Sequence, residues 1–118
     1  LSLVTFPYGT ADTEERFLSW QAPDGRIAGF CRLSLPRDGR TAMIRELHVY
    51  GRVSELGQVQ PGAQHRGLGR ALVEEACAQA AREGFTAVDV ISAVGTRPYY
   101  RRLGFADSGL YQRRALRP

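Results

Sequence analysis

Apolar residues recur with a helical period in the middle of the chain, between residues 67 and 83. The stripe that they form consists of Leu68, Ala71, Leu72, Val73, Ala76 and Ala80, whereas Arg70, Glu74, Glu75 and Arg82 lie outside it. Apolar positions three to four residues apart are typical of a helix with one face on the core. The pattern therefore predicts an amphipathic helix from about Gly67 to Glu83. Gly84 follows where a left-handed residue often ends a helix, so that Phe85 can fold back onto the last turn.

The first 50 residues instead show apolar segments separated by turn sequences. The predicted strands are Ser2–Tyr8, Arg16–Gln21, Arg26–Leu35 and Thr41–Tyr50. The sequence "APDG" separates the second strand from the third, and "PRDGR" separates the third from the fourth. Proline and glycine supply the backbone angles that tight turns need. The last three of these strands are therefore expected to form a meander.

The predicted strand Thr41–Tyr50 carries polar residues on both faces. Strict alternation places Met43, Arg45, Leu47 and Val49 on one face and Ile44, Glu46, His48 and Tyr50 on the other. Neither face is plainly the core, and a strand of this kind in a buried sheet often borders a functional site. A β-bulge is the feature that would re-aim either row of side chains.

The rest of the chain predicts a further helix and three more strands. The remaining elements are a loop over residues 51–63, a strand over Thr86–Ser92, a short helix opened by Pro98 and closed by Gly104, and two short strands around Phe105 and Tyr111. The late strand–helix–strand stretch favours a mixed sheet with helices packed on it. We therefore predict an α/β fold with a mixed sheet, in a single domain over residues 1–118.

The sequence "QHRGLG" stands where the long predicted helix begins. The first N–H groups of a helix are unpaired and attract anions. Gly67 and Gly69 remove the β-carbons that would hold a phosphate away, and Arg66 and Arg70 add positive charge. The stretch therefore predicts a cradle for a diphosphate. The alternative is a glycine-containing loop that merely enters a helix, since the pattern matches neither the dinucleotide nor the Walker motif.

Composition adds little to this picture. All 16 basic residues are arginine and the net charge is +4, which suits an anionic ligand or a nucleic acid only weakly. Cys31 and Cys77 stand far apart, so we expect two packed thiols rather than a metal site. The chain shows neither an apolar run long enough to cross a bilayer nor a signal-peptide pattern, which favours a cytoplasmic location without membrane contact.

Three motifs in this order resemble the GNAT superfamily of N-acyltransferases. They are "LHV" at residues 47–49, "QHRGLG" at residues 64–69 and "YRRLGF" at residues 100–105. The longer stretches "IRELHVYG" and "ISAVGTRPYYRRLGF" resemble more narrowly the acetyltransferase domain of Elongator catalytic subunits, which modify the wobble uridine of tRNA. The resemblance spans nearly the whole chain. The loop between "HVYG" and "QHRGLG" is shorter here than is usual in those subunits.

This resemblance implies that acetyl-CoA is a substrate and tRNA a partner of the full-length protein. In such enzymes the acetyl group passes to a radical-SAM domain, which holds a 4Fe-4S cluster and S-adenosylmethionine and attaches the acetyl group to carbon 5 of uridine 34. That domain, with its three cysteines, is absent from these 118 residues. The first residue is Leu1, so we expect a piece of a longer protein that carries this domain in cis.

The resemblance also implies roles for individual residues. The residues expected to line the acetyl-CoA groove are Glu46, Leu47, His48 and Val49, and those expected to hold the diphosphate are Gln64, His65, Arg66, Gly67, Leu68, Gly69 and Arg70. Tyr100 is the candidate general acid, because a phenol within hydrogen-bond reach can protonate the departing thiolate. Glu46 and His48 are candidate bases. Each role has a structural alternative. Tyr100 would then only anchor its helix, Leu47 and Val49 would be core residues, and His65 would be a solvated loop residue.

Two further hypotheses stay open at this stage. The chain is alternatively a stand-alone N-acetyltransferase for a small amine or a protein lysine, or a sensor that binds acyl-CoA without turnover. Arginines gather near the C-terminus at Arg97, Arg101, Arg102, Arg113, Arg114 and Arg117. Such a cluster is more often a solvated face than a nucleic-acid site, but the resemblance makes contact with the tRNA backbone a second interpretation. Tyr99, next to the candidate acid, is expected to have a packing role.

Overall fold

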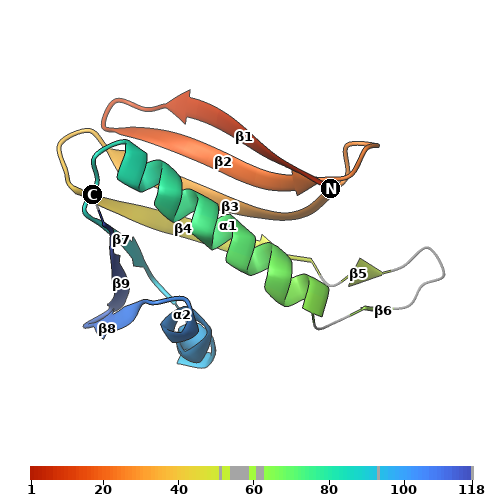
Figure 1. The fold of residues 1–118 in the computed structure, drawn as a ribbon. Helices are drawn as coiled ribbons and strands as arrows, with labels where there is room; N and C mark the ends of the chain where they lie inside the picture. The colour runs from red at the N-terminus through yellow and green to blue at the C-terminus, as the bar shows by residue number, and fades with distance from the viewer. Residues whose placement is uncertain (51, 54–58, 61–62, 93, 118) are drawn as a thin grey trace.

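The computed structural model describes residues 1–50, 52–53, 59–60, 63–92 and 94–117 and has a seven-stranded sheet at its centre (Figure 1). The strands of this sheet are β1 (Ser2–Gly9), β2 (Thr13–Gln21), β3 (Ile27–Pro36), β4 (Thr41–Val49), β7 (Ala87–Val90), β8 (Ala106–Ser108) and β9 (Tyr111–Ala115). The helices are α1 (Ala63–Arg82), the 3-10 helix η1 (Val94–Thr96) and α2 (Arg97–Arg102).

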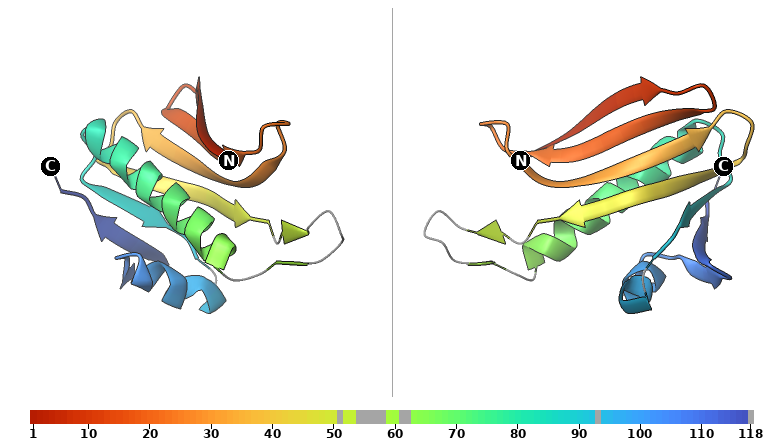
Figure 2. Two further views of the ribbon diagram at one scale, coloured as in Figure 1. Left: turned by 45° about the vertical axis from the view of Figure 1, so that its right-hand side comes forward. Right: turned by 180° about the vertical axis from the view of Figure 1, so that it is seen from behind.

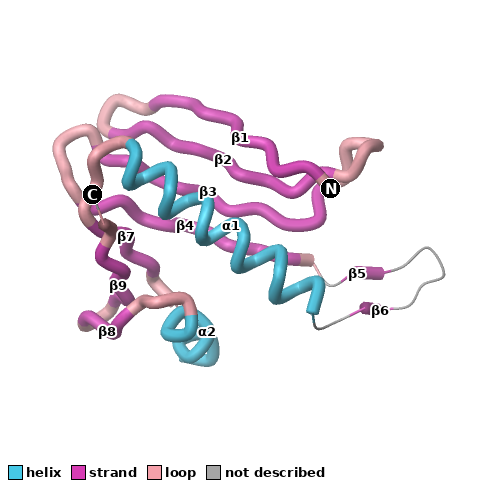
Figure 3. Tube along the Cα trace, viewed as in Figure 1, coloured by secondary structure: helices cyan, strands magenta, loops and turns pink. Residues whose placement is uncertain are grey.

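The order of strands across the sheet is β1-β2-β3-β4-β7-β9-β8. Neighbouring strands are antiparallel except for β4 and β7, which are parallel because α1 connects them (Figure 3). The predicted α/β fold with a mixed sheet and a β2–β4 meander is therefore confirmed. The stretch expected to be a loop over residues 51–63 differs, because the short strands β5 (Arg52–Val53) and β6 (Val59–Gln60) pair within it and α1 already begins at its end.

Helix α1 covers one face of the sheet, and the core lies between them (Figure 2). The core residues that α1 contributes are Leu72, Val73, Ala76, Cys77 and Ala80, and those of the central strands include Leu18, Cys31, Leu33 and Ile44. Polar groups also join the two layers, since the indole of Trp20 donates to the carbonyl of Leu68 at 3.2 Å. We call the face that α1 covers the inner face and the other the outer face.

The ends of α1 agree with the sequence pattern at one end only. Gly84 has the left-handed φ of +91° that the sequence predicted, and the N–H of Phe85 donates to the carbonyl of Ala80 at 3.0 Å. The predicted start at Gly67 is wrong, since the helix begins at Ala63. The turn that precedes Gly67 is helical although it lacks the apolar stripe used to predict the helix.

Both cysteines are buried and free, as predicted. Burial raises the pKa of the Cys31 thiol to about 12 and that of the Cys77 thiol to about 11. In the unfolded chain both thiols lose their protons near pH 9, whereas the folded protein retains them. The folded state is therefore stabilised fully below about pH 9, and this stability is lost as the pH rises from 9 to 12.

We accordingly expect the free energy of unfolding to fall above pH 9, with each thiol contributing a slope of about 1.4 kcal/mol per pH unit. Denaturant unfolding at several pH values between 8 and about 11 would measure the slope. Cys31→Ala lacks one of the two thiols, so its free energy of unfolding should fall less steeply with pH. Equal slopes for the two proteins would contradict the assignment to Cys31.

No helix in the described part of the chain combines the length and the apolar composition needed to cross a membrane.

Candidate functional site

Strands β4 and β7 are paired over only part of β4. Their parallel pairing runs from Thr41 opposite Ala87 to Ile44 opposite Val90, where β7 ends. Beyond Ile44, β4 continues to Val49 while pairing only with β3, as far as the structure describes the chain. In Figure 1, β7 runs at a steep angle away from the long strand β4. The main-chain groups of this edge of β4 are therefore available to an extended ligand.

A β-bulge lies where β4 leaves β7. Arg32 is opposite Glu46, but the next residue, Leu33, is opposite Ile44, so that Arg45 is the extra residue. The bulge reverses the alternation in this strand. Leu47 therefore packs against the core on the same side as Ile44. The uninterrupted alternation predicted from the sequence is wrong for this reason, and the bulge considered there is present.

Glu46 and His48 lie together on the outer face. Arg32 binds the Glu46 carboxylate with its Nη2 at 2.9 Å and also reaches Glu15 at 3.3 Å. The Nε2 of His48 is 3.8 Å from the other Glu46 oxygen, and its ring stacks on Phe30 with centroids 5.0 Å apart. The side chains of Glu46 and His48 are 41% and 57% exposed, so both candidate bases are open to solvent.

The start of α1 lies at the same end of the molecule as the open end of β4 (Figure 1). Gly67 and Gly69 stand within the helix, so the unpaired N–H groups at its start belong to the turn before Gly67. Gly67 is exposed, and a β-carbon placed there would have no atom within 4 Å. The side chains of Gln64, His65 and Arg66 lie outside the described part of the structure, and the predicted diphosphate cradle stays a prediction.

Helix α2 holds Tyr100 in the core. The phenol is 7% exposed and makes edge-to-face contacts with Tyr99 and Phe105, with ring centroids 5.3 and 5.6 Å apart. Burial raises the pKa of Tyr100 well above its usual value of 10, so the hydroxyl remains protonated. The phenol therefore has a proton to donate, but burial also makes it a weaker acid than a free tyrosine. The ring of Tyr100 also anchors α2. Tyr100 belongs to the inner face, opposite to Glu46 and His48.

The buried Gln112 fixes α2 against the sheet. Its side chain is fully buried, and its Nε2 donates to the carbonyl of Arg97 at 3.0 Å and to Asp107 at 3.1 Å. The hydroxyl of Ser92 lies against its Oε1. Because leaving these groups unpaired in the core is costly, the network holds the start of α2 in one position. No motif in the sequence indicated this role of Gln112.

Most arginines near the C-terminus are paired with acids. Arg101 binds Asp107 at 2.7 Å, and Arg97 lies 3.6 Å from the same carboxylate. The other pairs are Arg113 with Asp89 at 2.6 Å and Arg114 with Glu74 at 3.0 Å. Of the six arginines, only Arg102 and Arg117 have no acidic partner among the described residues.

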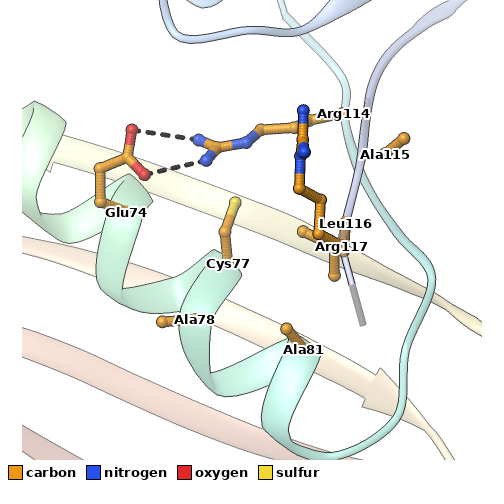
Figure 4. A pocket seen from close by; sticks show the side chains of 8 residues that line it. All are labelled: Glu74, Cys77, Ala78, Ala81, Arg114, Ala115, Leu116 and Arg117. Carbon is orange, nitrogen blue, oxygen red and sulfur yellow. Dashed lines mark hydrogen bonds and ion pairs between the residues drawn. The ribbon is translucent and has the colours of Figure 1, made fainter.

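A cavity of about 300 Å³ lies away from the open edge of β4, between the C-terminal half of α1 and the end of β9 (Figure 4). Its walls include Cys77, Ala78, Ala81 and Leu116, and the ion pair between Arg114 and Glu74 crosses one end. None of the residues predicted from the sequence to contact acetyl-CoA lines it.

Residues 4–105 match the family model described as the acetyltransferase (GNAT) family. The chain is 38% identical over 116 residues to a tRNA uridine(34) acetyltransferase of Dehalococcoides mccartyi, covering 88% of this chain and 25% of that protein. It is 40% identical over 128 residues to human Elongator complex protein 3, covering 99% of this chain and 23% of that protein. The chain thus spans about a quarter of the length of these curated relatives.

Solved structures show the same architecture. The structure of the archaeal Methanocaldococcus infernus Elp3 superposes with a TM-score of 0.84 at 32% identity, covering 98% of this chain and 30% of that one. An acetyltransferase from Bacillus cereus superposes with a TM-score of 0.71 at 19% identity, covering 88% of this chain and 74% of that one, and shows the fold alone.

Proposed function

Because the chain belongs to the acetyltransferase (GNAT) family, we propose that it binds acetyl-CoA along the open edge of β4 and cleaves the thioester there. The observation that carries the proposal is the separation of β4 from β7 after Ile44. An extended pantetheine chain carries amides that can pair with a strand edge in the same way as an added strand. The neighbouring start of α1 offers unpaired N–H groups to the diphosphate.

Residues of the chain would then act on the thioester in turn. A backbone N–H of β4 beyond the bulge polarises the carbonyl oxygen of the acetyl group. As the carbon–sulfur bond breaks, the electron pair stays on sulfur, and the protonated Tyr100 donates its proton to the thiolate. The products are free CoA and an acetyl group bonded to the acceptor. With water as the acceptor the product is acetate, and the proton that water releases restores the phenol.

We further propose that the chain is the acetyltransferase part of an enzyme that modifies uridine 34 of tRNA and responds to tRNA. Its similarity to Elongator complex protein 3 and to a tRNA uridine(34) acetyltransferase supports this. A radical-SAM domain with its 4Fe-4S cluster and S-adenosylmethionine is expected elsewhere in a longer protein. Arg102 and Arg117, which have no acidic partner in the part of the chain that the structure describes, are the arginines of the C-terminal cluster that we expect to meet a phosphate backbone.

Transfer to an amine is the second candidate function. Glu46 and His48 are exposed on the outer face beside the open end of β4, where either could deprotonate an amine. Arg32 holds Glu46 in an ion pair at 2.9 Å, which orients the carboxylate.

One assay separates these functions. CoA release from acetyl-CoA would be followed with a thiol reagent in the absence of an acceptor, with tRNA, and with a panel of amines and lysine peptides. We expect calorimetry to show binding of acetyl-CoA and the assay to show release that tRNA stimulates. Release that depends on an amine and ignores tRNA would favour the second function. Binding of acetyl-CoA without release of CoA under any condition would favour a sensor. A chain that does not bind acetyl-CoA would overturn the proposal.

A further inference from the structure

The side chain of Tyr99 reaches from α2 to the second turn of α1. A β-carbon placed on Gly69 would lie 2.5 Å from the Tyr99 hydroxyl oxygen and 3.6 Å from Cζ of the same ring. It would also lie 3.4 Å from Cγ2 of Val49, at the open end of β4. The phenol thus occupies the space that a side chain at position 69 would need, and Gly69 is buried under it. Three elements meet at this point: α1, α2 and β4.

Gly67 has different surroundings from Gly69. Both glycines lie in the second turn of α1, but a β-carbon on Gly67 meets nothing within 4 Å. The two glycines of "QHRGLG" therefore have different surroundings. A ligand approaching α1 can explain a glycine at 67, whereas a side chain at 69 would displace the Tyr99 hydroxyl.

Tyr99 also contacts the candidate acid directly. Its ring meets that of Tyr100 edge to face at 83°, and both belong to the core around α2. Burial raises the pKa of Tyr99, although Arg102 and Arg70 lie close enough to oppose the effect, so the hydroxyl stays neutral where it packs. A displacement of Tyr99 from Gly69 would therefore be passed on to Tyr100.

We propose that Tyr99 is a positioning residue of the acetyl-CoA site, whose hydroxyl, seated on Gly69 next to Val49 of β4, sets the spacing between α1 and α2 and so fixes the position of Tyr100. This inference rests on the proposed function. It assigns Tyr99 more than the packing role expected from the sequence, because the contact of Tyr99 with Gly69 fixes where the candidate acid lies relative to α1.

A double-mutant cycle tests the inference. Gly69→Ala adds a methyl group against the Tyr99 hydroxyl, and Tyr99→Phe removes that oxygen and keeps the ring. We expect Gly69→Ala to weaken acetyl-CoA binding and to lower the turnover of CoA release, each by about tenfold, since overpacking a closed contact displaces its neighbours. In Gly69→Ala/Tyr99→Phe most of both losses should be recovered. Gly67→Ala with and without Tyr99→Phe is the matched control, for which no such recovery is expected.

Each result decides the matter. Recovery in the double variant, for the dissociation constant and for turnover, supports a positioning role. Loss in Gly69→Ala without recovery would mean that Gly69 is needed by the ligand rather than by Tyr99, and would overturn the inference. The two substitutions could instead be coupled only in the unfolding temperature, with binding and turnover unchanged. Tyr99 would then have a packing role alone, and the inference would be overturned. Failure of the wild-type chain to bind acetyl-CoA would instead refute the proposed function, and with it the inference.

Discussion

Gly67→Val is expected to weaken acetyl-CoA binding by about a hundredfold while the fold remains intact. Gly67 is exposed in the second turn of α1, next to the free N–H groups where the diphosphate is expected. The branched side chain would hold the phosphates away from these groups. Losing two charge-assisted hydrogen bonds at about 1.5 kcal/mol each corresponds to about two decades in the dissociation constant. Calorimetry with acetyl-CoA measures the loss directly.

The fold should tolerate this change, because a β-carbon at position 67 meets no atom within 4 Å. Gly67→Ala makes the test sharper. It should raise the free energy of unfolding by about 0.5–1 kcal/mol, because alanine favours the helix, while still weakening binding. Arg82→Val, at an exposed position in the last turn of α1, is the matched control and should bind acetyl-CoA like the wild type. Unaltered affinity in Gly67→Val would remove the cradle from this site.

Tyr100→Phe is expected to lower the turnover of CoA release by about a hundredfold with acetyl-CoA binding retained. General acid catalysis contributes about 10²–10⁴ to rate, and the variant loses the only proton donor that we assign to the thiolate. The ring contacts with Tyr99 and Phe105 do not involve the hydroxyl, so α2 should stay in place. A thiol reagent reports the released CoA, because Cys31 and Cys77 are buried. Calorimetry on the same variant shows whether binding persists.

Tyr111→Phe provides the control, since Tyr111 is 37% exposed on β9 and lies outside the site. Its turnover should equal that of the wild type. If Tyr100→Phe also releases CoA at the wild-type rate, Tyr100 is an anchor of α2 only, and the proton comes from water or another group. If binding is lost together with turnover, the phenol serves the ligand rather than the departing thiolate.

Local patterns sufficed for most of the elements. The apolar stripe from Leu68 to Ala80 predicted α1 because a helix brings these positions to one face, and Gly84 marked its end because only glycine readily adopts the left-handed conformation found there. The same pattern did not predict the start of α1 correctly. Ala63 to Arg66 carry no apolar period, so the pattern that predicted the helix begins only at Leu68.

Short motifs also predicted where the candidate site lies, but they did not predict the geometry of its residues. Alternation along β4 assumed an uninterrupted strand, whereas the bulge at Arg45 depends on how β3 and β4 pair, which no local pattern contains. For the same reason the sequence could not show that Arg32 holds Glu46, because the two residues meet across the sheet.

By itself, then, the sequence determined most of the helices and strands and the motifs of the candidate site, because both depend on neighbours along the chain. Only the tertiary structure decided which faces those residues take and which of them touch. Tyr99 and Gly69 are 30 positions apart, and a glycine that lies under a distant hydroxyl has the same letter as a glycine with open space beside it. The difference between Gly67 and Gly69 lies in what stands beside each of them in space.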